Sequence, residues 1–142
     1  ETANVKKAGT DLDVEVKFLY PDNSESSWYT LDNPGDDREK GNTDFYYVPG
    51  VDSNFKNIKL RVKHEPAHLY DSVAYDAWKL NRIWIVAGDL SGLQNLFYNF
   101  SQWIEVPQGD PNWHEIKLPS PSYNIGLSAE MLMKIAGLAA RS

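Results

Sequence analysis

Apolar and polar residues alternate through most of this 142-residue chain. In residues 11–20, Val14, Val16 and Phe18 are separated by charged side chains, so one face of the segment is apolar and the other is polar. A period of two recurs in residues 58–62, 80–86 and 96–106, and shorter apolar segments occur at residues 27–31, 45–48 and 113–118. This pattern predicts an all-β fold, an antiparallel β-sandwich of two roughly four-stranded sheets.

The C-terminal end has a different pattern, with the period of a helix. Ser128 can cap the first turn of a helix that extends over residues 128–141. Four apolar residues share one face of this helix: Met131, Leu132, Ile135 and Leu138. We therefore expect a sandwich domain over residues 1–120 and an extension over residues 121–142 that is helical from residue 128.

Composition narrows the possible functions. The chain carries 14 basic and 20 acidic residues and a net charge of −6, so it lacks the basic surface that nucleic acids require. It contains no cysteine, which excludes disulfides, thiolate catalysis and cysteine-ligated zinc. Neither a Gly-x-Ser-x-Gly motif, a His-Glu-x-x-His motif nor a glycine-rich phosphate loop is present. We expect that the chain by itself is not an enzyme.

Two acidic clusters are candidates for a cation site. One lies at residues 9–13 and the other at residues 36–41, and both contain glycine beside their carboxylates. Adjacent carboxylates repel each other, and a cation between them removes that cost. Calcium prefers six to eight oxygen ligands, including backbone carbonyls, and loops of this composition supply both kinds. A solvated acidic loop is the alternative interpretation of the same pattern.

One N-glycosylation sequence, Asn99-Phe100-Ser101, occurs in the chain. Its apolar surroundings argue against its use as a glycan acceptor.

Five segments, taken in order, resemble the PLAT (lipoxygenase-homology) domain family. An Ala-Gly-Thr-Asp turn at residues 8–11 leads into an alternating strand, as in the opening segment of the family. Residues 36–45 are similar to the family's second conserved loop, and residues 58–65 to its next strand. The strand that begins with Trp78 and the closing segment at residues 100–104 complete the resemblance.

The resemblance implies a non-catalytic module that associates a larger or partner protein with membrane lipid or with another protein. A membrane-peripheral or secreted location is favoured. Several members bind calcium between the two matched loops. The resemblance assigns the ion backbone carbonyls of Gly9 and Thr10 and the carboxylates of Asp11, Asp36, Asp37, Glu39 and Asp76. Calcium is therefore the expected cofactor.

The chain also departs from the family pattern. Only seven residues precede the Ala-Gly-Thr-Asp turn, so the first strand of the family is absent, truncated or replaced by a segment such as residues 113–118. Arg38 occupies a position where the family usually has phenylalanine, which places a cation beside the expected calcium site. Trp78 and Trp103 are expected to fill the core. The inserted tryptophans of some lipoxygenases have no clear counterpart, and the nearest membrane-contact candidates are Val5, Leu69, Tyr70 and Val73.

Two other binding functions remain open. In a carbohydrate-binding sandwich, Trp28, Tyr29, Trp84 and Trp113 would form an aromatic platform for sugars. A protein-docking domain is the other alternative, and an unpaired sheet edge would allow a homodimer.

Overall fold

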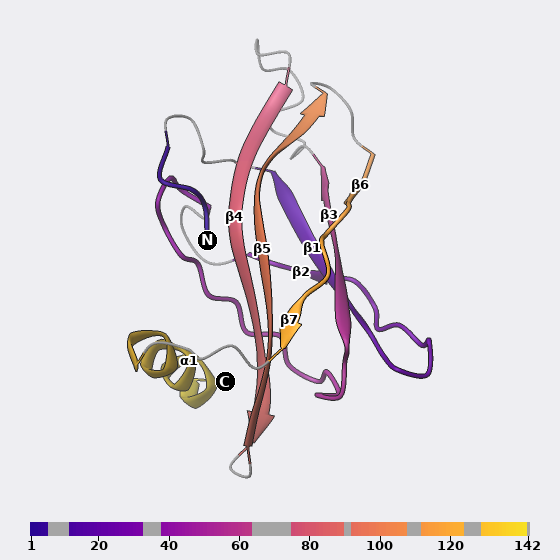
Figure 1. Cartoon of the computed structure of the whole chain (residues 1–142), viewed down its shortest axis with the longest axis vertical. Coiled ribbons are helices and arrows are strands. Elements are labelled where there is room, and N and C mark those ends of the chain that lie inside the picture. Colours follow the sequence, from indigo (N-terminus) through magenta and orange to yellow (C-terminus); the bar gives the residue numbers. More distant parts are fainter. Residues whose placement is uncertain are drawn as a thin grey trace.

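The computed structural model describes residues 1–5, 12–32, 38–63, 75–89, 92–107, 112–123 and 129–141. Its strands are β1 (Asp13–Leu19), β2 (Tyr29–Thr30), β3 (Asn57–Lys63), β4 (Tyr75–Asp89), β5 (Gly92–Pro107), β6 (His114–Ile116) and β7 (Ser122–Tyr123), followed by the helix α1 (Ala129–Arg141). They form two antiparallel sheets, one with the order β2-β1-β3-β6 and one with the order β4-β5-β7 (Figure 1). The predicted all-β sandwich with a short C-terminal helix is confirmed.

The central strands of the four-stranded sheet, β1 and β3, follow the alternation of the sequence. Val16 pairs with Leu60 and Phe18 pairs with Ile58, and all four side chains are buried. Successive side chains of a strand point to opposite faces. The charged residues between these apolar ones therefore lie on the outer face of the sheet.

Strands β4 and β5 form a long hairpin that extends past β1 and β3 in Figure 1. Its register shifts between Leu80 and Arg82, opposite the stretch of β5 where Ser101 has a φ of 48°. Before the shift Leu80 is buried, and after it Ile83 and Ile85 pack against the core. The even-numbered residues of β4 therefore face the core before the β-bulge, and the odd-numbered residues face it after the bulge.

The hydrophobic core contains side chains from both sheets. Its buried members are Leu12, Val14, Val16, Phe18, Phe55, Ile58, Leu60, Val62, Trp78, Leu80, Leu96, Tyr98, Phe100, Ile104 and Val106. Tyr98 is fully buried, and its hydroxyl donates to Asn57 Oδ1 and accepts from the Ile58 N–H at 3.1 Å. Burial raises the pKa of Tyr98 to about 12.

The N-terminal segment lies along the edge of β4. Thr2 forms a β-bridge with Leu80, and the Ala3 N–H donates to the carbonyl of Lys79 at 3.0 Å. Thr2 Oγ1 accepts a hydrogen bond from the Trp78 indole at 2.9 Å. This edge of the sheet is thus paired by residues 1–3. Residues 113–118 do not replace them, because β6 pairs with β3 in the other sheet.

The prediction of a strand at residues 45–48 is wrong. This segment has no β-pairing, and its aromatic side chains instead contact groups outside the sheets. Tyr46 accepts a hydrogen bond from Arg38 Nη1 at 3.1 Å, and the ring of Phe45 lies 5.4 Å from Lys134 Nζ in α1. The seventh strand is β7, which pairs with Leu96 and Phe97 of β5.

The helix α1 begins at Ala129, and the predicted cap Ser128 lies outside the described residues. Met131 and Ile135 are half-buried, as the predicted apolar face requires. Leu132 is 38% exposed and does not belong to the packed face.

Candidate functional site

Several strand ends meet at the upper end of the sandwich in Figure 1. Asp13 at the start of β1 pairs with Lys63 at the end of β3, and Tyr75 at the start of β4 pairs with Pro107 at the end of β5. Of the segments expected to bind calcium, residues 9–11 precede β1 in the sequence, and Asp76 lies at the start of β4. Five of the seven residues proposed for the ion, namely Gly9, Thr10, Asp11, Asp36 and Asp37, lie outside the described residues.

Arg38 links the sequence positions that flank the two expected calcium loops. Its Nη2 donates to the Leu12 carbonyl at 2.9 Å, and its Nη1 donates to the Leu31 carbonyl at 2.9 Å. Leu12 follows the loop that contains residues 9–11, and Leu31 closely precedes the loop that contains residues 36 and 37. One buried guanidinium therefore holds the flanks of both loops together, although a side chain of this charge is seldom buried.

The backbone of Arg38 is also constrained. Its φ is 56°, and its N–H donates to the Asp44 carboxylate at 2.9 Å. The side chain is only 6% exposed. The sequence interpretation treated Arg38 as a cation beside the calcium ligands, whereas the structure directs its two Nη atoms into backbone carbonyls and the Tyr46 hydroxyl.

The two remaining calcium candidates, Glu39 and Asp76, lie among the described residues. Glu39 is exposed, and its carbonyl accepts from the Asn42 N–H at 3.1 Å. Asp76 lies near the start of β4, where its backbone pairs with Val106. Among the described residues, no three His, Cys, Asp or Glu side chains form a group that could hold a metal ion. The full candidate set consists of carboxylate and carbonyl oxygens, which is the ligand chemistry that calcium prefers.

Trp103 is an exposed aromatic residue that sequence reasoning placed in the core. Its neighbours Ile104 and Val106 are buried, so Trp103 lies on the opposite, outer face and is 44% exposed. It pairs with Lys79 across the hairpin, and Lys79 Nζ lies 5.9 Å from the centre of the indole. The adjacent Ile104 was the available signal, because consecutive strand residues cannot both face the core.

Of the four membrane-contact candidates, only Val5 lies among the described residues, where it is 40% exposed. The other three, Leu69, Tyr70 and Val73, lie outside them. Val5 follows the segment in which Ala3 pairs with Lys79, the cross-strand neighbour of Trp103. Within the described ranges, the chain has no helix with the length and apolar character needed to cross a bilayer.

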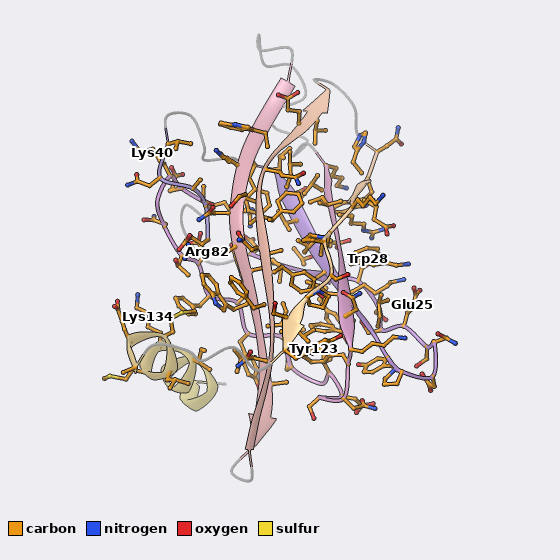
Figure 2. The ribbon with its side chains drawn as sticks, viewed as in Figure 1. Glu25, Trp28, Lys40, Arg82, Tyr123 and Lys134 are labelled. Atoms are coloured by element: carbon orange, nitrogen blue, oxygen red, sulfur yellow. The ribbon has the colours of Figure 1, made fainter. Side chains whose placement is uncertain are left out.

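The outer face of the four-stranded sheet carries two tryptophans stacked on cations. Arg61 Cζ lies 4.2 Å from the centre of the Trp28 ring and 4.4 Å from the centre of the Trp113 ring. Lys17 Nζ lies 5.0 Å from the centre of the Trp28 ring, and Lys63 Nζ lies 4.6 Å from the centre of the Trp113 ring. The row Lys17–Trp28–Arg61–Trp113–Lys63 is called the cation–aromatic ladder below. Figure 2 shows Trp28 on the outer side of this sheet.

The four aromatic residues considered as a sugar platform do not come together. Trp28 and Trp113 belong to the cation–aromatic ladder, whereas Trp84 lies on the other sheet beside Phe97, at 5.6 Å between ring centres. Tyr29 packs against Phe18 at 6.0 Å. A sugar stacking on the ladder would have to displace cations that already lie over both indoles.

In a comparison with known protein families, the family model described as PLAT/LH2 domain matches residues 1–112 of the chain. No curated protein matches the sequence.

Proposed function

Because the chain belongs to the PLAT/LH2 domain family, whose members are lipid- or protein-binding modules, we propose that it is a non-catalytic, calcium-dependent module that associates a larger or partner protein with membrane lipid. PLAT domains are generally non-catalytic. The sequence has no Gly-x-Ser-x-Gly motif, no His-Glu-x-x-His motif and no glycine-rich phosphate loop, which agrees with this role.

The observation that supports this proposal most directly is the position of Arg38. By hydrogen bonding to the carbonyls of Leu12 and Leu31, it fixes positions next to both acidic loops. A cation site assembled from two loops binds more tightly when the loops are held near each other before the ion arrives, because less conformational entropy is lost on binding.

Calcium would supply the positive charge that the clustered carboxylates need. Gly9 and Thr10 would offer backbone carbonyls, and the carboxylates of Asp11, Asp36, Asp37, Glu39 and Asp76 would complete the set. Binding would gather the carboxylates of both loops around one ion.

Lipid contact is supported by exposed residues on the outer face of the β4–β5 hairpin and in the N-terminal segment. Trp103 and Lys79 form an aromatic and cationic pair, and Val5 follows the neighbouring N-terminal segment. Tryptophan is favoured at the boundary between lipid and water, because its ring is apolar while its N–H can be hydrated. We propose Trp103 and Val5 as contacts with the membrane interface, together with Leu69, Tyr70 and Val73.

A calcium titration by calorimetry, with thermal melting in calcium and in chelator, tests the ion site. We expect heat of binding and a higher melting temperature in calcium, since a ligand that binds only the folded state stabilises it by about 2.7 kcal/mol at 100 times its Kd. The double variant Asp37→Ala, Glu39→Ala should abolish both effects. The matched control is Asp22→Ala, Glu25→Ala, which removes the same charge from the exposed β1–β2 connection.

The absence of heat and of a melting shift at millimolar calcium would show that the ion site does not exist. An equal loss in the control pair would show that net charge, and not these loops, carries the effect.

Sedimentation with anionic and zwitterionic vesicles, with and without calcium, tests the lipid contact. We expect calcium-dependent binding that Trp103→Ala weakens several-fold and that Tyr47→Ala, at a residue 51% exposed elsewhere, leaves unchanged. If calcium binds but no vesicle does, the lipid partner is wrong and a protein partner takes its place.

A further inference from the structure

The Asn99-Phe100-Ser101 sequence lies in the exposed part of a strand, contrary to the expectation from its apolar neighbours. Tyr98 is 0% exposed and Phe100 is 7% exposed, so both side chains point into the core. Asn99 lies between them in β5 and is therefore on the opposite face, where its side chain is exposed. The apolar residues that argued against a glycan are the ones that direct Asn99 outward.

The surroundings of Asn99 leave room for a large polar substituent. Its cross-strand partner Arg82 has a side chain that is 50% exposed. Figure 2 shows Arg82 beside β4, about midway along the long hairpin. Ser101 is also exposed, and its Oγ lies within hydrogen-bonding distance of two amide oxygens, Asn81 Oδ1 at 2.8 Å and Asn99 Oδ1 at 3.2 Å. The contact with Asn99 involves the oxygen of the amide and not the nitrogen, which is the atom to which a sugar is attached.

An aromatic pair lies next to Asn99 on the same outer face. Phe97 precedes Asn99 by two residues, and the Phe97 and Trp84 ring centres are 5.6 Å apart. Both rings are half-buried, so part of each apolar surface remains in contact with water. The C–H face of a sugar attached to Asn99 could cover this surface.

From these three observations we propose that Asn99 is an N-glycosylation site whose first sugar packs against Phe97 and Trp84. The donor is a lipid-linked oligosaccharide pyrophosphate, and a separate transferase catalyses the reaction. Asn99 Nδ2 forms a bond to the anomeric carbon of the first sugar, while the bond from that carbon to the pyrophosphate oxygen breaks. The lipid pyrophosphate leaves, and the amide loses one proton. Neither oxidation nor reduction occurs.

The glycan would lie on the outer face of the β4–β5 hairpin around Asn99 and Arg82. The start of β4, which carries Asp76, lies on the other side of the β-bulge, near the upper end of the sandwich. Glycosylation would leave Asp76 accessible, and it would limit the surfaces available to a partner, including the one around Trp103 in the same strand. The site does not depend on the proposed lipid or calcium binding.

Secretory expression of the full chain in eukaryotic cells, behind a cleavable signal sequence, tests the site. We expect one glycan, seen as a mass shift that peptide-N-glycosidase F removes. Asn99→Gln and Ser101→Ala should abolish the shift, and Ser101→Thr should keep it. Glu25→Thr is the positive control, because it creates a sequon at Asn23-Ser24 in the exposed turn after β1. An unmodified Asn99 in cells that modify Asn23 in this control would overturn the proposal.

The packing of the first sugar is tested by the melting temperature before and after the glycan is removed. Enzymatic removal of the glycan from the folded protein should lower the melting temperature by a few degrees, and the deglycosylated protein should match the Asn99→Asp variant. In a Phe97→Ala background, removal of the glycan should change the melting temperature much less. An equal decrease in both backgrounds would show that the sugar does not pack on this aromatic pair.

Discussion

Arg38 and Tyr98 are two buried polar side chains whose hydrogen bonds join distant parts of the chain. Arg38 connects the backbone at Leu12 and Leu31, and the Tyr98 hydroxyl connects β5 to Asn57 and to the backbone of β3. A buried polar group without partners would cost about 1–3 kcal/mol, so such bonds determine whether burial is tolerated. Both side chains therefore make the arrangement of neighbouring segments specific as well as stable.

Tyr98 leads to a prediction about alkaline pH. Its pKa is raised to about 12 in the folded protein, compared with about 10 in an unfolded chain. Between these values the unfolded chain has lost the proton that the folded chain keeps, so the contribution of Tyr98 to stability is complete below pH ~10 and is lost as pH rises toward ~12.

Denaturant unfolding of the wild type and of Tyr98→Phe from pH 7 to pH 12 measures this contribution. At pH 7 the variant should be less stable by about 1–2 kcal/mol, because it lacks the buried hydroxyl. The difference should shrink above pH 10. A difference that stays constant across the whole range would contradict the raised pKa.

The edge strands β2 and β6 are too short to be held by backbone pairing alone. They contain two and three residues, and each is preceded by a tryptophan of the cation–aromatic ladder. Arg61 in β3 contacts both indoles, and its Nε also donates to Glu15 Oε1 of β1 at 2.9 Å. One central arginine thus attaches both edges of the four-stranded sheet to its middle.

Arg61→Met should weaken both edges together. Partly desolvated cation–π contacts contribute about 1–2 kcal/mol, so the loss of two contacts and of the Glu15 bond should lower the free energy of unfolding by roughly 2–4 kcal/mol. Hydrogen exchange should increase in β2 and β6 before it increases in β5. The control Lys59→Met changes a half-buried lysine of the same strand, whose ion pair with Glu25 is at the surface, and should alter neither measurement much. Faster exchange at one edge alone would show that the ladder does not act as a unit.

On the scale of the whole molecule, none of the helix side chains that the structure describes belongs to the buried cluster. The buried cluster takes its side chains from the strands and from Leu12 and Phe55, while the described helix residue Met133 is 76% exposed. Figure 1 shows α1 beside the sandwich, where Lys134 meets Phe45. The division into a sandwich over residues 1–120 and an extension over residues 121–142 stays a prediction, as does a homodimer through a sheet edge.

Deletion of residues 129–142 tests this division. Because none of the described side chains of α1 belongs to the buried cluster, we expect a shortened chain that still unfolds cooperatively. The loss should be about 1–3 kcal/mol, from the Phe45 contact and from the half-buried Met131 and Ile135. Near-ultraviolet circular dichroism and a thermal melt of both chains provide the measurement. Loss of the cooperative transition would show that the helix is an integral part of the domain.

Local alternation was enough to predict the sandwich, because side chains in a strand point alternately to its two faces whatever the strand pairs with. It therefore identified β1 and β3 and their buried residues, and the ordered motifs identified the family. The prediction of a strand at residues 45–48 was wrong, because an apolar segment forms a strand only if the edge of a neighbouring strand is available for pairing.

The tertiary structure decided which side of β5 carries the functional residues. Trp103 and Asn99 are exposed because Ile104, Tyr98 and Phe100 occupy the core, and the bulge opposite Asn81 determines how the two strands align. Arg38 is buried because carbonyls from two distant positions meet around it. Such choices depend on contacts between segments far apart in the chain, and a local pattern of residues does not encode the distances that separate them.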